Sequence, residues 1–300
     1  MNREKSHDLG IRTLINGSSA VLIALLIFLA HYPALRWIFA AAVSFVGGIA
    51  VGEYDRLVKK KGLFPARGLS ITFVMLYILS VFIKIQGHSS AYSSFWLEGP
   101  KIILVLAFLS CFVYFAVAGL PPITHIATTF LGIIYTAVPL GLFVSIMYFF
   151  THPGLQEPIY EGTWWIIYLI AVTKSADIGG YFIGNAFGKR KLAFKLSPKK
   201  TLEGALGGLL GSTLMSLGIC YLGKRYGGVF AEFSYVQSLW IGALVGIVGQ
   251  MGDLAESLLK RDAGVKDSNS IPGVGGILDM IDSLLFTAPV IYIFLKIIYH

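Results

Sequence analysis

Long apolar segments, each near the ~20 residues that a helix needs to cross a bilayer, restrict the possible folds more than any other feature. Hydrophobic residues make up 56% of the chain and lie in continuous blocks. Such blocks differ from the half-apolar pattern of a surface helix in a soluble protein. The sequence therefore predicts an all-α, polytopic integral membrane protein.

Nine of these blocks are predicted to be transmembrane helices. They cover residues 13–30, 35–52, 68–86, 102–120, 127–150, 163–187, 205–222, 237–252 and 282–299. The sixth is unusual because Lys174 and Asp177 lie inside it. A basic stretch precedes the first, but no small-residue cleavage site follows it. We therefore expect an uncleaved first helix rather than a signal peptide.

Lysine and arginine indicate the orientation. With the N-terminus in the cytoplasm, the predicted inside segments carry 17 of the 24 Lys and Arg residues. That bias agrees with the positive-inside rule and favours a cytoplasmic N-terminus. The net charge of +8 then reflects cytoplasmic loops and an anionic substrate, with no nucleic-acid partner expected. We expect a multi-pass protein of a bacterial cytoplasmic (inner) membrane.

Ionisable residues divide the chain into two parts. The first five predicted spans, in residues 1–150, contain almost no charge at mid-span. We interpret 1–150 as a scaffold of packing and lipid-facing helices. Residues 151–300 hold four spans with three polar clusters near their cytoplasmic ends, and charges placed there usually line a functional cavity. We interpret 151–300 as the catalytic region, with its site facing the cytoplasm.

The first cluster lies within the sixth span. Lys174, Asp177 and Tyr181 are spaced i, i+3, i+7, so they share one face of a helix. The charges could line a cavity or form an ion pair that joins two helices. Three glycines at four-residue intervals would let another helix approach closely: Gly180, Gly184 and Gly188.

The second cluster is the basic loop 188–204. Ser197 followed by Pro198 is typical of a helix N-cap and first turn. A helix beginning there would direct free N–H groups toward an anion beside Lys199, Lys200 and Thr201. The charges at 189–191 are interpreted as an ordinary positive-inside loop.

The third cluster lies between 250 and 283. Asp253, Glu256 and Lys260 share a helix face, and Asp279 and Asp282 are spaced i, i+3 at the start of the ninth span. Carboxylates on two facing helices can hold Mg²⁺ while waters and phosphates complete its coordination.

A glycine-rich turn, 272–276, separates the two acidic groups. Its backbone N–H groups could approach a phosphate, although it is neither a Walker A nor a Rossmann motif. The six histidines are scattered, which argues against a zinc site and a Ser/His/Asp hydrolase. Carboxylates, lysines and a glycine turn together favour metal-assisted phosphoryl or nucleotidyl transfer.

These residues resemble the signature of the phosphatidate cytidylyltransferase (CDP-diacylglycerol synthase) family. The pattern S-x-x-K-R-x4-K-D begins at Ser257, a P-G-H-G-G-like turn occupies 272–276, and a D-R-x-D-like close occupies 279–282. The family's S-P-K-K-T-x-E-G and D-x-G-x-Y-F are intact at 197–204 and 177–182. Two positions depart from the pattern: Val274 replaces His and Met280 replaces Arg.

The resemblance implies that CTP and phosphatidate, a bilayer lipid, react to give CDP-diacylglycerol and pyrophosphate. It implies that the enzyme uses Mg²⁺, and it leaves open whether a second, monovalent or divalent cation also binds. The implied catalytic residues are Asp253, Asp279, Asp282, Lys260 and Lys266, of which the three aspartates would bind metal. The implied substrate-binding residues are Ser197, Lys199, Lys200, Thr201, Glu203, Asp177, Tyr181, Arg261, Asp267, Gly275 and Gly276.

Two other functions stay open from the residues alone: a CTP-dependent polyprenol or lipid kinase, and a transporter of anionic solutes. The kinase would release CDP instead of pyrophosphate. A homodimer also stays open, because four glycines at GxxxG spacing fit packing within one chain or between two copies: Gly204, Gly208, Gly242 and Gly246.

Overall fold

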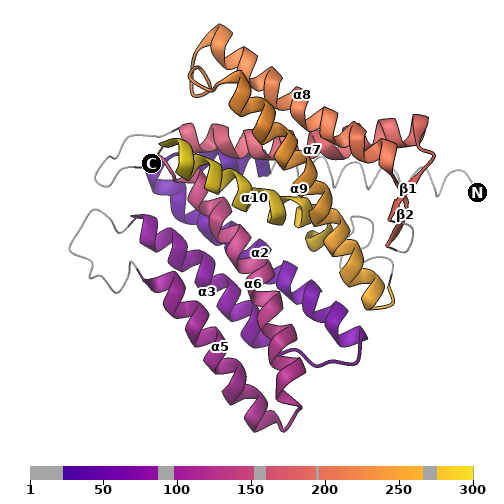
Figure 1. The fold of residues 1–300 in the computed structure, drawn as a ribbon. Coiled ribbons are helices and arrows are strands. Elements are labelled where there is room, and N and C mark those ends of the chain that lie inside the picture. Colours follow the sequence, from indigo (N-terminus) through magenta and orange to yellow (C-terminus); the bar gives the residue numbers. More distant parts are fainter. Residues whose placement is uncertain (1–22, 87–97, 152–159, 194–195, 266–275, 300) are drawn as a thin grey trace, which may run out of the picture.

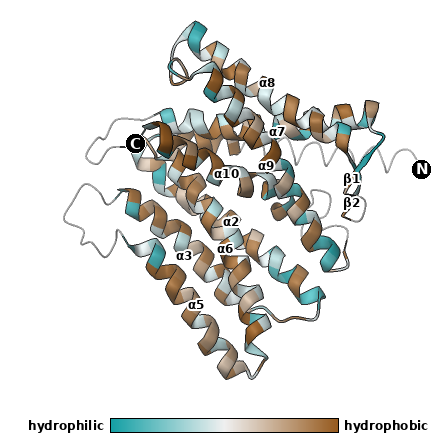
Figure 2. Ribbon diagram, in the orientation of Figure 1, coloured by the Kyte–Doolittle hydropathy of each residue, from teal (hydrophilic) through white to brown (hydrophobic). Residues whose placement is uncertain are grey.

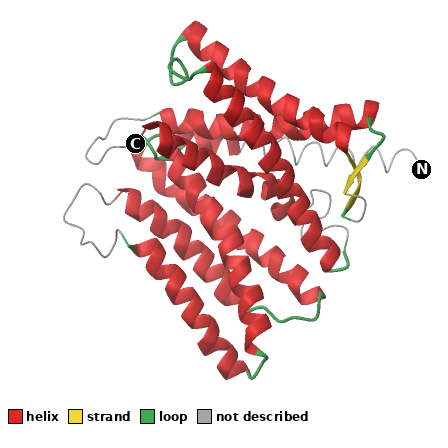
Figure 3. Ribbon diagram, in the orientation of Figure 1, coloured by secondary structure: helices red, strands yellow, loops and turns green. Residues whose placement is uncertain are grey.

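The computed structural model describes residues 23–86, 98–151, 160–193, 196–265 and 276–299 as a bundle of long helices (Figure 1). The elements are η1 (Pro33–Leu35), α2 (Arg36–Lys60), α3 (Arg67–Gln86), α5 (Gly99–Ala118), α6 (Pro122–Met147), α7 (Glu161–Phe187), β1 (Lys191–Ala193), β2 (Ser197–Thr201), α8 (Leu202–Tyr226), α9 (Tyr235–Asp262) and α10 (Ile277–Tyr299). The strands form one short hairpin in an otherwise helical part of the chain (Figure 3). The predicted all-α class is confirmed.

Eight helices of the described residues are long and apolar enough to cross a membrane, and they match the second to ninth predicted spans. Hydrophobic residues, drawn in brown, lie along all of these helices (Figure 2). Most of the first predicted span, 13–30, lies outside the described residues. These helices make the chain a multi-pass membrane protein.

Two helices continue well beyond their predicted apolar spans. α2 runs to Lys60 and α9 to Asp262, so Glu53 lies on a helix where a loop was expected, and Asp253 lies on a helix, as its spacing to Glu256 predicts. Hydropathy reports where apolar residues stop, whereas the helix continues through residues such as Glu, Leu, Lys and Arg, which favour it. The extra turns carry much of the polar chemistry described below.

The N-terminal helices α2, α3 and α6 pack through large side chains. Ile78, Phe82 and Ile133 are fully buried between them. Even the glycines there make room for side chains: a Cβ on Gly132 would lie 2.5 Å from the ring of Tyr54. This part of the core is held by interlocking aliphatic and aromatic groups.

The C-terminal helices α7 and α8 pack backbone against backbone. A Cβ on Gly179 would lie 2.5 Å from the carbonyl oxygen of Gly207, and one on Gly204 would lie 2.9 Å from that of Gly180. The close helix approach predicted from the glycine spacing is confirmed, and it occurs within one chain. The glycine spacing therefore no longer argues for a homodimer, which stays a prediction.

The hairpin corrects one prediction. Ser197 does not cap a helix, because 197–201 form β2, which pairs antiparallel with β1. The N-cap of α8 is Thr201, whose Oγ1 accepts a hydrogen bond of 3.1 Å from the N–H of Gly204. Thr201 has extended backbone angles and a β-branched side chain, so one residue can both end the strand and cap the helix.

Candidate active site

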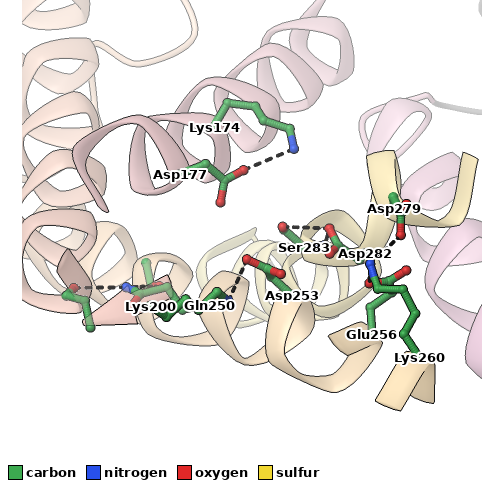
Figure 4. A network of polar contacts seen from close by, with 12 residues as sticks. Lys174, Asp177, Lys200, Gln250, Asp253, Glu256, Lys260, Asp279, Asp282 and Ser283 are labelled. Carbon is green, nitrogen blue, oxygen red and sulfur yellow. Dashed lines mark hydrogen bonds and ion pairs between the residues drawn. The ribbon is translucent and has the colours of Figure 1, made fainter. Parts of the chain in front are cut away.

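One cavity of about 880 Å³ brings the three sequence clusters together. It lies among α7, α8, α9, α10 and the hairpin, and the close-up in Figure 4 shows its charged residues facing one another from separate helices. The predicted site residues that line it are Asp177, Tyr181, Lys199, Lys200, Thr201, Asp253, Lys260, Asp279 and Asp282. Segments as far apart in the sequence as Lys174 and Ser283 thus form one polar site.

The hairpin supplies the basic side of the cavity. Lys200 Nζ lies 2.6 Å from Asp253 Oδ2 on α9, which joins the second and third clusters directly. Lys199 and Lys191 of the two strands also line the cavity. Lysines on a short strand can follow an incoming polyphosphate while their backbone stays fixed by the strand pairing.

Carboxylates of α9 and α10 line the side opposite the hairpin lysines, and they differ in their hydrogen-bond partners (Figure 4). Asp279 of α10 accepts a 2.8 Å hydrogen bond from Lys260 Nζ, and Lys260 also pairs with the buried Glu256 one turn earlier on α9. Asp282 has one oxygen, Oδ1, held at 2.9 Å by the hydroxyl of Ser283. Asp253 and Asp282 thus have partners other than Lys260, namely Lys200 and Ser283.

The predicted pair on α7 is internal to that helix. Lys174 Nζ and Asp177 Oδ2 lie 3.1 Å apart, at i and i+3, and both residues line the cavity. The alternative of an ion pair is thus correct as to the pair itself, but both of its partners lie on α7 rather than on two helices. Both side chains are more than a third exposed, so a ligand phosphate or cation could take either partner with little rearrangement.

The carboxylates suit a divalent cation that the substrate helps to bind. Among the residues that the structure describes, no group of three or more His, Cys, Asp or Glu side chains could hold a metal ion. Asp253 and Asp282 nevertheless offer hard oxygen ligands from adjacent helices to one cavity. This donor set fits Mg²⁺, which commonly takes one or two carboxylates and completes its octahedron with water and phosphate oxygens.

Four predicted residues do not line the cavity: Ser197, Glu203, Arg261 and Gly276. Glu203 accepts hydrogen bonds from the N–H groups of Lys189 (3.0 Å) and Arg190 (3.1 Å), and so holds the hairpin to α8. Arg261 Nε donates to the carbonyl oxygen of Leu196 at 3.0 Å, which holds the hairpin to α9. Three further predicted residues lie outside the described part of the chain: Lys266, Asp267 and Gly275.

The cavity also contains polar residues that were not among the predicted site residues. Lys174 and Glu256 were noted only as members of their clusters, and Lys191 was interpreted as a topological charge. Gln250 has no role in the sequence prediction; its side-chain N–H₂ donates to the carbonyl oxygens of Ala205 (3.1 Å) and Gly246 (3.0 Å). The sequence signal that could have identified Gln250 was an amide side chain within an apolar span, one turn before Asp253.

The fold and this cavity define a multi-pass membrane enzyme whose site suits ligands rich in phosphate. The chain belongs to the cytidylyltransferase family, whose sequence model matches residues 12–298.

Curated relatives are similar to this chain over most of its length and of their own. The phosphatidate cytidylyltransferase of Chlamydia pneumoniae is 34% identical over 292 residues, covering 97% of this chain and 92% of the relative. That of Synechocystis is 34% identical over 284 residues, covering 87% and 89%. That of Bacillus subtilis is 31% identical over 292 residues, covering 97% and 98%. The predicted family resemblance is confirmed.

Proposed function

We propose that this protein is a phosphatidate cytidylyltransferase, which converts CTP and phosphatidate to CDP-diacylglycerol and pyrophosphate for phospholipid synthesis. The observation that carries the proposal is the cavity in which Lys200 meets Asp253 and Lys260 meets Asp279. Full-length relatives carry the same activity in their names.

The reaction needs charge compensation more than base catalysis. An oxygen of the phosphatidate phosphate attacks the α-phosphorus of CTP, and the bond from that phosphorus to the oxygen bridging to the β-phosphate breaks. Pyrophosphate leaves with the bonding electrons. The nucleophile is already anionic, so the barrier comes from bringing two anions together and from charge on the leaving group. Lys199, Lys200 and Lys260 are placed to offset both.

Asp253 and Asp282 would hold Mg²⁺ in this proposal. The bound ion would neutralise charge on the phosphate oxygens of CTP. The ion pair with Lys200 orients Asp253 before the nucleotide arrives. The ligand role of Asp279, which is paired with Lys260, and a second cation both stay predictions.

The lipid would enter from the bilayer beside α7. Tyr181 lines the cavity and is 69% exposed, and its neighbour Phe182 is 65% exposed on the same helix. Apolar rings at the rim of a charged cavity suit acyl chains whose phosphate reaches inward. We place this rim at the cytoplasmic side of a bacterial inner membrane, because CTP is a cytoplasmic nucleotide and the lysine bias favours that orientation.

The test is an assay with CTP labelled at either the α- or the γ-phosphate, using purified protein, phosphatidate vesicles and Mg²⁺. A cytidylyltransferase puts the α-label into the chloroform-extractable lipid and releases the γ-label as pyrophosphate. A lipid kinase would put the γ-label into lipid and release CDP. No labelled lipid from either CTP, across a range of divalent cations, would reject both enzymes and leave the transporter.

A further inference from the structure

Glu53 of α2 makes a contact that crosses from the N-terminal half to the catalytic helices. It is 1% exposed, and its two carboxylate oxygens accept hydrogen bonds from consecutive backbone N–H groups at the start of α10. Oε1 lies 3.1 Å from Ile277 N, and Oε2 lies 2.8 Å from Leu278 N. The two groups are 224 and 225 positions away in the sequence.

The contact satisfies groups that a helix cannot satisfy itself. The first N–H groups of a helix lack intrahelical acceptors, and a carboxylate there also interacts favourably with the helix dipole. A nearby residue in the chain usually provides this cap. On α10, Asp279 Oδ2 accepts from Gly276 N at 3.4 Å, and Glu53 takes the next two N–H groups. A second helix therefore provides most of the cap.

The capped turn carries the site carboxylates. Asp279 follows Leu278 directly, and Asp282 lies one helical turn beyond Leu278 on the same face. α9 and α10 touch at this level, since a Cβ on Gly252 would lie 2.7 Å from the carbonyl oxygen of Asp282. A small shift or rotation of the start of α10 would therefore move Asp282 relative to Asp253 of α9.

A weaker contact at the C-terminal end of α2, about two turns beyond Glu53, acts on the neighbouring helix. Lys61, the C-cap residue of α2, donates to the backbone oxygen of Asp262 at 3.1 Å and pairs with its carboxylate. Asp262 ends α9, as Ile277 begins α10. One end of α2 thus holds both helices that bear the acidic residues of the cavity.

We propose that Glu53 is a positioning residue, which fixes the start of α10 so that Asp279 and Asp282 face the cavity in the geometry that nucleotidyl transfer requires. Glu53 is not among the residues that line the cavity; it acts through the backbone of α10. The inference rests on the proposed function for its catalytic consequence, while the capping contact can be tested without substrate.

Two measurements on the purified protein in lipid nanodiscs test this role. Hydrogen–deuterium exchange, without substrate, compares the exchange rates of the N–H groups at 277–278 with those of α6. Steady-state kinetics give kcat and KM separately. The variants are Glu53→Ala, which removes both acceptors, and Glu53→Gln, which keeps one. The control is Asp55→Asn on the same helix, since Asp55 is also buried but lies beside Arg67 and Ser70 of α3.

For Glu53→Ala we expect faster exchange confined to the start of α10. We also expect a kcat lower by roughly 10- to 100-fold with little change in KM, the range typical of residues that orient metal-binding groups. Glu53→Gln should be intermediate in both readouts, and Asp55→Asn should match the wild type in both.

Wild-type kcat in Glu53→Ala would overturn the proposal, as would a kcat loss without faster exchange at 277–278. An equal loss in Asp55→Asn would do the same, because it would assign the effect to any buried charge on α2. If Glu53→Ala cannot be purified, Glu53→Gln decides by the same criteria. An inactive wild type would reject the proposed function, while the exchange data would still judge the cap.

Discussion

Glycines show how differently the two halves of this protein are packed. In α2 and α6 they accommodate side chains: a Cβ on Gly47 would lie 2.7 Å from Ile78 Cδ1, and one on Gly141 would lie 2.8 Å from the ring of Tyr77. In α7 and α8 they accommodate backbone, as at Gly179 and Gly207. A side chain can turn away from an intruding atom, but a packed helix backbone cannot.

This difference matches what each half does. Two walls of the cavity are α7 and α8, whose backbones touch and so hold Asp177 and the hairpin in a fixed relation. The N-terminal helices supply buried volume, and they reach the site through contacts such as Glu53 to α10. The two halves thus differ in how their helices pack, and the geometry of the site depends on both. The division into scaffold and catalytic region stays a prediction.

The largest effect is expected for Asp282→Asn, which removes one proposed metal ligand and keeps the shape of the side chain. Turnover should fall by at least about 100-fold, the scale seen when a group that stabilises transition-state charge is lost. Product formation from α-labelled CTP measures it, and the thermal unfolding midpoint checks the fold. Turnover near the wild-type value would reject the metal role of Asp282 and weaken the contrast between a catalytic and a supporting half.

Lys200→Ala should have the next largest effect. It removes a cation from the hairpin and leaves Asp253 without the partner that lies 2.6 Å away. We expect kcat/KM for CTP to fall by roughly 10- to 100-fold, the size expected when a charged group that binds a ligand loses about 1.4 to 2.7 kcal/mol of interaction. Lys200→Arg should recover part of the loss. An unchanged kcat/KM in Lys200→Ala would remove the hairpin from the site.

The sequence was sufficient to predict the fold class, eight of the helices that the structure describes, and nine of the residues that meet in the cavity. The reason is physical. Apolar length identifies a membrane helix, and charges are costly enough within a bilayer that their positions mark a site. Helical spacing then indicated which charges share a face, as with Asp253 and Lys260.

Long-range contacts could not be predicted in the same way. Glu53 was expected in a loop, because hydropathy falls there, and nothing local indicates that it caps a helix 224 positions later. The role of Ser197 was misassigned because Ser-Pro begins helices often, and only the pairing of β2 with β1 shows that the segment is a strand. Both cases depend on which segments meet, and sequence spacing does not contain that information.

Adding a methyl group to glycines should distinguish the two packing modes by stability. Gly179→Ala meets the backbone of Gly207 and should cost about 1–3 kcal/mol. Gly47→Ala meets the end of the flexible Ile78 side chain and should cost less. Gly218→Ala, with open space around its Cβ, is the control and should be neutral or slightly stabilising. Denaturant unfolding in detergent micelles measures all three, and equal losses at Gly179 and Gly47 would contradict the comparison.

The smallest effect is expected for Lys61→Ala. Its pair with Asp262 is exposed, at 48% and 64% of the two side chains, so its loss should cost no more than about 1 kcal/mol. Because the same contact holds the end of α9, we expect a modest decrease in kcat that 0.5 M salt reproduces in the wild type by screening the pair. Kinetics of both proteins at low and high salt measure this. A decrease as large as that of Glu53→Ala would contradict the view that the buried cap on α10, rather than the exposed pair on α9, is the main link between the halves.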